Sequence, residues 1–260
     1  MRRFFLALVL LMLAGCATRS TAPPKDRELS RTGDLARAAF EDGATARAAD
    51  LYRKALNRAH AMDDATEIGN AAYNLALFQI LLGQLDQASA ALAEAKAAFT
   101  RSGGNPADVL LLEATVAQRQ GKLAQALSLA DQVLSASPDE DDLVQAVLLQ
   151  GTIACQQDDP ARARTALAEA SQHHIANTAL LAAKERLAGT IFLLERNPAA
   201  AAAAFDRAAA LFQKAKHYRD MALTLRRAGE AYQEAGDTRR AEDWLLRAQR
   251  SLAAQGEKAE

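Results

Sequence analysis

The sequence predicts an all-α protein, a solenoid of about six helical hairpins stacked along the chain. Two observations lead to this prediction. The 260 residues are 50% hydrophobic but only 5% aromatic, and only six are proline, which is typical of helical proteins. A pattern of small and large residues also returns six times, 37 to 40 residues apart when residue numbers are subtracted. Because stacked hairpins bury their apolar faces on their neighbours, we expect one elongated domain.

The first 15 residues have the pattern of an export signal. Arg2 and Arg3 precede an apolar run over residues 4–14, which is too short to span a bilayer permanently. The run ends in Leu-Ala-Gly-Cys16, which resembles the lipobox of bacterial lipoproteins. That resemblance implies removal of residues 1–15 and a covalent lipid on Cys16. The alternative is an ordinary signal peptide with an incidental cysteine.

The same resemblance implies a location. Ala17 follows the cysteine where an aspartate would signal retention, so we expect anchoring in the outer membrane, facing the periplasm. Residues 16–28 lack periodicity, and their Pro23-Pro24 pair favours an extended chain. We therefore expect a flexible, lipid-anchored tether over residues 16–28 and the solenoid over residues 29–260.

Each predicted hairpin has three marks. A small residue lies in the middle of the first helix, where a second helix crosses it: Ala36, Ala76, Ala114, Gly151, Gly189 and Gly229. A break then ends the first helix: Gly43, Gly83, Gly121, Asp158, Arg196 and Gly236. A triad, mostly small-large-small, lines the second helix, as in Ala88, Leu92 and Ala95. After the two non-glycine breaks, Asp159-Pro160 and Asn197-Pro198 place an N-cap before a proline at the first helical position.

In this register the sequence resembles the tetratricopeptide-repeat (TPR) family over about residues 29–255. The resemblance implies a right-handed superhelix. The usual repeat has 34 residues, so the longer period predicts helices extended by about one turn. Residues 251–260 are too few for a separate capping helix after the sixth triad. Either the charged last helix caps the array itself, or Trp244 marks a surface for self-association.

The sequence contains few features that indicate catalysis or the binding of metals, cofactors or nucleic acids. The 31 basic and 32 acidic residues nearly balance, so we expect no nucleic-acid partner. We find no nucleophile, phosphate-loop or metal-site motif, and we expect no catalytic activity, no metal and no cofactor besides the lipid on Cys16. We expect Cys155 to be packed in the core, His173-His174 to lie in a surface turn, and the acidic residues 139–142 to begin a helix.

The TPR resemblance also implies a binding surface, because first helices of that family line a concave groove. Carried over by motif position, the groove residues are Tyr73, Asn74, Leu77, Leu111, Leu148, Arg186 and Arg226. We expect the groove to be apolar in the middle and basic toward the carboxyl end. The alternative for the two arginines is an ordinary solvated surface, since Asp220, Glu230 and Glu234 lie nearby in sequence.

These expectations lead to a hypothesis of function. We expect a non-catalytic scaffold that binds an envelope protein or peptide segment in its groove. In architecture it is similar to repeat lipoproteins that act as pilotins or assist barrel assembly. The alternative is an accessory docking subunit of an envelope enzyme or transporter, such as a cell-wall hydrolase. The sequence does not indicate an oligomeric state.

Overall fold

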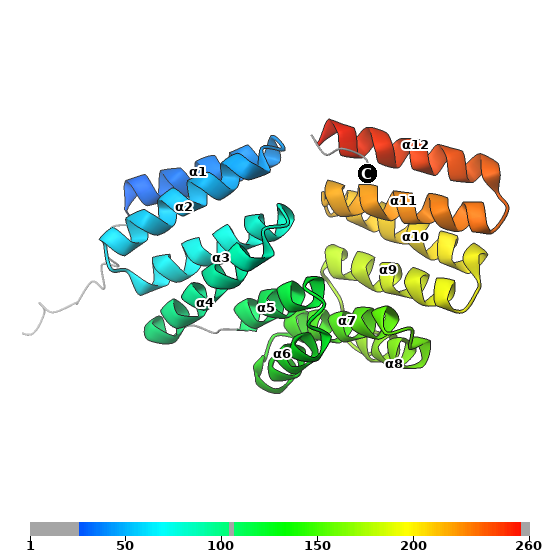
Figure 1. Ribbon diagram of the computed structural model, residues 1–260, viewed down its shortest axis with the longest axis horizontal. Coiled ribbons are helices and arrows are strands. Elements are labelled where there is room, and N and C mark those ends of the chain that lie inside the picture. The colour runs from blue at the N-terminus through cyan, green and yellow to red at the C-terminus, as the bar shows by residue number, and fades with distance from the viewer. Residues whose placement is uncertain (1–25, 104–106, 256–260) are drawn as a thin grey trace, which may run out of the picture.

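A computed structural model describes residues 26–103 and 107–255 of the chain. These residues form helices without any strand. In chain order the helices are α1 (Arg27–Glu41), α2 (Thr45–Ala61), α3 (Ala65–Leu81), α4 (Leu85–Ser102), α5 (Ala107–Arg119), α6 (Leu123–Ala136), α7 (Glu140–Gln156), α8 (Pro160–Ala170), α9 (Thr178–Leu194), α10 (Pro198–Lys214), α11 (Tyr218–Glu234) and α12 (Thr238–Ala254) (Figure 1). Consecutive helices pack as six antiparallel hairpins, so the all-α solenoid predicted from the sequence is confirmed.

The predicted crossing residues all lie in the core. The three alanines and three glycines at mid-helix are buried, and two of the glycines meet large side chains of the following helix. A Cβ atom on Gly189 would lie 2.7 Å from the Phe205 ring, and one on Gly229 would lie 2.7 Å from Leu245 Cγ. Small residues are therefore needed at these crossings, and the predicted register of the repeats is confirmed.

The predicted breaks are also where the chain turns. Every break has a positive φ, from 57° at Asp158 to 82° at Gly236, in the left-handed region that ends helices. After the two non-glycine breaks, the side chains of Asp159 and Asn197 accept hydrogen bonds from the first turns of α8 and α10, each of which begins with proline. The predicted N-cap and proline arrangement is confirmed.

The helix lengths explain the long repeat period. Seven helices have 17 residues, α4 has 18, and α8 has 11. The prediction of extended helices thus holds for most units. Helix α1 begins at Arg27, two residues before the predicted start of the solenoid, because the Asp26 side chain caps it by accepting a hydrogen bond from Leu29 N. Cys16 and most of the predicted tether lie outside the described residues.

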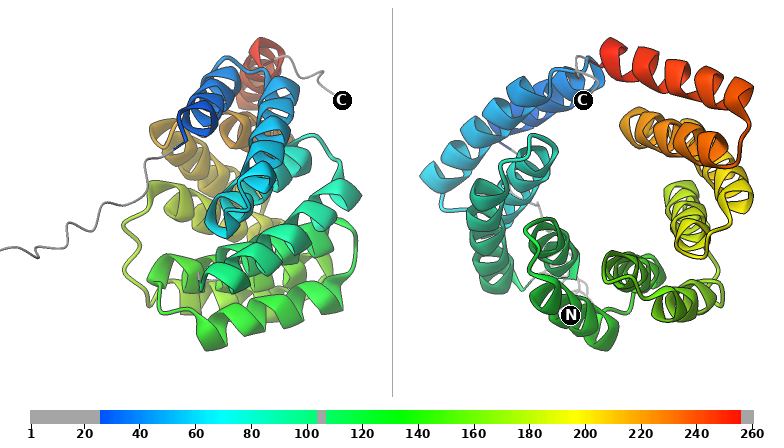
Figure 2. Two further views of the ribbon diagram at one scale, coloured as in Figure 1. Left: turned by 90° about the vertical axis from the view of Figure 1, so that its left-hand side faces the viewer. Right: turned by 45° about the vertical axis from the view of Figure 1, so that its right-hand side comes forward.

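The solenoid curves into a nearly closed ring, so that its first and last hairpins lie next to each other. Figure 2 (right) shows the hairpins arranged as a ring, with the end of α12 beside the turn that joins α1 to α2. A Cβ atom on Gly43 in that turn would lie 3.8 Å from the carbonyl oxygen of Gln255. The concave surface therefore faces the interior of a nearly closed ring. None of the described helices is long and apolar enough to cross a membrane.

The last helix has a charged outer surface. Its exposed residues include Arg239, Arg240, Glu242, Asp243, Arg247 and Arg250. Trp244 is half-buried against the core and is covered by Arg247, whose guanidinium carbon lies 3.9 Å from the ring centroid. Leu246 remains 43% exposed. Within the described residues, α12 thus ends the array with charged side chains in place of a further helix.

Candidate functional site

The candidate site is a concave hollow inside the ring, which we call the inner groove. It has a volume of about 580 Å³. Side chains from α3, α5, α7, α9 and α11 line it, together with Phe205 of α10. The first helices of five successive hairpins therefore build one continuous wall, because the repeat places the same helical face toward the interior in each unit.

The structure brings four of the seven predicted groove residues to this wall: Tyr73, Leu111, Leu148 and Arg186. The other three lie outside its lining. Asn74 donates its amide to the carbonyl of Asn70 at 2.7 Å, Leu77 is half-buried, and Arg226 Nε lies 3.9 Å from Glu230 Oε1.

The middle of the inner groove is apolar, as expected. Leu111 and Leu148 are only 7% and 6% exposed, and the half-buried Leu112 and Leu149 extend the same floor. The threonine hydroxyls between the leucines donate to carbonyls of their own helices, as Thr115 does to Leu111 at 2.9 Å. The floor therefore offers leucine side chains as its main contact surface.

One end of the inner groove is acidic. Asp108 lines it at the start of α5, and Tyr73 lies nearby on α3. Burial by the concave wall raises the pKa of Asp108, and the charges of Asp142 and Asp139 raise it further. Burial also raises the pKa of Tyr73 to about 12, and the charges of Asp108 and Asp142 contribute. Sequence reasoning missed Asp108, although it lies three residues before Leu111 on the same helix face.

The other end is rich in arginine. Arg119, at the end of α5, lines the inner groove and donates to the carbonyl of Ile80 at 3.1 Å. Burial lowers the pKa of Arg119, and the charges of Arg219 and Arg186 lower it further, while the charge of Asp220 acts in the opposite direction. Arg227 also lines this end, with its guanidinium carbon 5.4 Å from the centroid of the Phe205 ring.

Carboxylates partly balance these arginines. Arg186 Nη1 lies 3.0 Å from Asp220 Oδ1, and Arg227 Nε lies 3.7 Å from Glu230 Oε2. Burial favours a raised pKa for Asp220, but the neighbouring His217 and the hydrogen bond and charge of Arg186 outweigh it and lower the pKa. The prediction that nearby acidic residues offset the arginines is therefore partly met, and sequence reasoning missed both Arg119 and Arg227.

Comparison with known proteins identifies the architecture. The sequence matches no known protein-family profile and no curated protein. The fold is similar to BtubC from P. vanneervenii (TM-score 0.55, 20% identity, 90% of this chain and 95% of that one) and to PilW (0.57, 14%, 88% and 95%). It is also similar to PilF of Pseudomonas aeruginosa (0.53, 17%, 86% and 91%). These solved structures are TPR proteins. The chain has the tetratricopeptide-repeat fold.

Cys155 lies on the wall of this TPR groove. It is buried, as predicted, although it lines the hollow and is not confined to the hairpin core. Burial raises the pKa of the thiol to about 11, while the charge of Arg227 acts in the opposite direction. The thiol is therefore protonated at neutral pH, which is the unreactive form.

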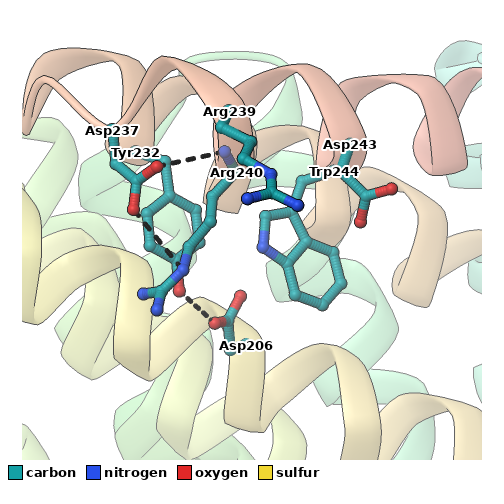
Figure 3. A pocket seen from close by; sticks show the side chains of 7 residues that line it. All are labelled: Asp206, Tyr232, Asp237, Arg239, Arg240, Asp243 and Trp244. Carbon is teal, nitrogen blue, oxygen red and sulfur yellow. Dashed lines mark hydrogen bonds and ion pairs between the residues drawn. The ribbon is translucent and has the colours of Figure 1, made fainter.

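A second hollow, of about 790 Å³, lies at the carboxyl end of the TPR array between α10, α11 and α12 (Figure 3). Its polar groups bond largely to one another. Tyr232 donates its hydroxyl to Asp206, Arg240 N donates to Asp237 Oδ1 at 3.1 Å, and the Arg240 guanidinium lies over the Tyr232 ring. Trp244 borders this hollow, so its indole is an edge of the cavity and not an isolated exposed patch.

The other chemical candidates occupy structural positions. Asp139 caps α7 by accepting a hydrogen bond from Asp141 N, so the acidic residues begin a helix, as predicted. His173 and His174 lie between α8 and α9, as predicted, and His173 Nδ1 is 3.3 Å from Glu140 Oε1. Across residues 26–103 and 107–255, no cluster of three or more histidine, cysteine or acidic side chains has the arrangement of a metal site.

Proposed function

We propose that this chain is a non-catalytic scaffold that holds a segment of another protein in its inner groove. The observation that carries the proposal is the continuous wall from five successive hairpins, apolar in the middle and charged at both ends. An apolar floor supplies affinity to a protein segment, and the charges at its ends select among segments. Such a wall suits a chain longer than a small metabolite.

We further propose that the scaffold acts in the bacterial envelope, anchored to the periplasmic side of the outer membrane through a lipid on Cys16. Two observations support this location. The sequence before Cys16 resembles a lipobox, and the structurally similar PilW is a type IV pilus biogenesis factor. The proposed partner is accordingly an envelope protein.

Site-specific crosslinking in living cells tests the function. A photoreactive amino acid replaces Leu149, a half-buried residue of the groove floor, and a matched control places it at the exposed Gln249 on α12. We expect the Leu149 position to yield a discrete adduct with an envelope protein and the Gln249 position to yield none. Adducts of the same protein from both positions, or none from Leu149, would contradict groove binding. An adduct with an enzyme or transporter would identify the scaffold as its docking subunit.

A further inference from the structure

The two charged ends of the inner groove are separated by the length of one helix. Asp108 and Arg119 both line the groove from α5, near its first and last residues. Eleven residues of helix at 1.5 Å each place these two positions about 16 Å apart. The leucine floor lies between them, so the groove has an acidic end, an apolar middle and a basic end in a fixed order.

The charge at each end has a consistent sign. The charges that act on Asp108 come from Asp139 and Asp142, both carboxylates. At the opposite end, Arg119, Arg186 and Arg227 line the groove. Asp220 pairs with Arg186 and Glu230 pairs with Arg227, whereas Arg119 donates to the neutral carbonyl of Ile80. Both ends therefore keep an excess of one sign, negative near Asp108 and positive near Arg119. A ligand that spans the floor meets two opposite charges.

The dimensions of the groove indicate the conformation of its ligand. The two charged ends of the groove lie about 16 Å apart along α5. An extended chain covers the same distance in about five residues at about 3.3 Å each. The side-chain amides of Gln118, Gln145 and Gln156 also line the groove, and amides both donate to and accept from an extended backbone.

We infer that the inner groove takes an extended segment of a partner protein with a basic side chain at one end, apolar side chains in the middle, and an acidic side chain about five residues away. The basic side chain lies at Asp108 and the acidic one at Arg119, with the apolar residues on Leu111, Leu112, Leu148 and Leu149. This inference rests on the proposed function and adds the charge order of the segment that the scaffold selects.

Three fluorescent peptides with blocked termini test the charge order: KTLLTE, KTLLTK and ETLLTE. Fluorescence anisotropy with the purified solenoid gives their affinities at low and at moderate salt. We expect KTLLTE to bind at least about fivefold more tightly than either of the others at low salt, and the difference to shrink as salt rises. Equal affinities within about twofold, or no binding by any of the three, would overturn the inference.

Charge reversals in the protein make the test reciprocal. Asp108→Arg gives two basic ends and should shift the preference to ETLLTE, whereas Arg119→Glu should shift it to KTLLTK. Arg227→Glu repeats the second test without removing the bond from Arg119 to Ile80, in case that bond is needed for folding. Glu242→Arg and Arg250→Glu on the exposed face of α12 are matched controls and should leave the ranking unchanged. An unchanged ranking in all three groove variants would contradict the inference.

Leu112→Glu separates this inference from the proposed function, because it places a charge in the apolar floor that both require. If the three peptides bind equally and Leu112→Glu abolishes their binding, the groove binds segments but does not read charge order. If they bind and Leu112→Glu has no effect, they bind elsewhere, which contradicts the inference and weighs against the groove itself. If none binds, the inference is overturned, and the crosslinking at Leu149 decides the proposed function.

Discussion

Gly189 faces Phe205 so closely that a Cβ atom on Gly189 would lie 2.7 Å from a ring carbon of Phe205. Phe205 is fully buried and leaves no space for a larger residue on α9. We therefore expect Gly189→Leu to destabilise the protein by roughly 1–3 kcal/mol or more through overpacking. Urea denaturation followed by circular dichroism measures this loss, and Gln249→Leu on the exposed face of α12 is the control. Equal midpoints for the two variants would contradict this packing.

The predicted groove residues give a second expectation. Charge reversal of both Arg186 and Arg226 should weaken binding of the partner segment most strongly at low salt, because it acts through screened attraction. Asn74 lies outside the lining and its amide bonds to the Asn70 carbonyl, so Asn74→Ala is a control that should leave binding unchanged. Titration of the crosslinked partner segment at two salt concentrations tests both. Unchanged affinity in the arginine variant would exclude both arginines from the binding surface.

His217 should give the stability a pH dependence. The Asp220 carboxylate, whose Oδ2 lies 3.8 Å from His217 Nδ1, raises the pKa of His217, despite an opposing effect of burial. A raised folded-state pKa means that the stabilisation is fully present below about pH 6.5, the unfolded value, and is lost as pH rises through the folded value. Replacing His217 with Gln should therefore cost more at pH 5.5 than at pH 8.5, by less than about 1 kcal/mol. Urea midpoints at both pH values check this, and an equal cost would exclude the ion pair.

Cys155 should react slowly in the folded protein. Because burial raises the thiol pKa to about 11, little thiolate is present at pH 8. We expect alkylation by iodoacetamide to be at least about tenfold slower than in urea and to accelerate as pH rises toward 10. Mass spectrometry gives both rates. A folded-state rate equal to the rate in urea would show that the groove wall opens at Cys155.

The lipid anchor is tested apart from the fold. Cys16→Ala should abolish palmitate labelling and release the chain from the membrane fraction, since no described helix is able to span a bilayer. Retention of the variant in the outer membrane after a salt wash, without labelling, would mean that a partner holds the protein there. Retention of labelling would show that another residue carries the lipid.

The sequence predicted the parts of this fold that depend on short-range chemistry. The sequence predicted Gly189 and the break at Asp158 because each repeat needs a small residue where its helices cross. Each repeat also needs a residue that can end the first helix. The two ends of the groove were not found, because they depend on how far the array curls. Arg119 belongs to the third hairpin and Arg227 to the sixth, yet both line the inner groove. The residue pattern within one repeat does not indicate which side chains from distant repeats face each other.

The approach of Gly43 to Gln255 has a mechanical consequence. Five interfaces separate the first hairpin from the last, and each hairpin packs mainly on its immediate neighbours. Small rotations at the five interfaces therefore add up to a large displacement between Gly43 and Gln255. The width of the opening between the first and the last hairpin therefore depends on the packing at all five interfaces. A substitution at any one of these interfaces should change that width.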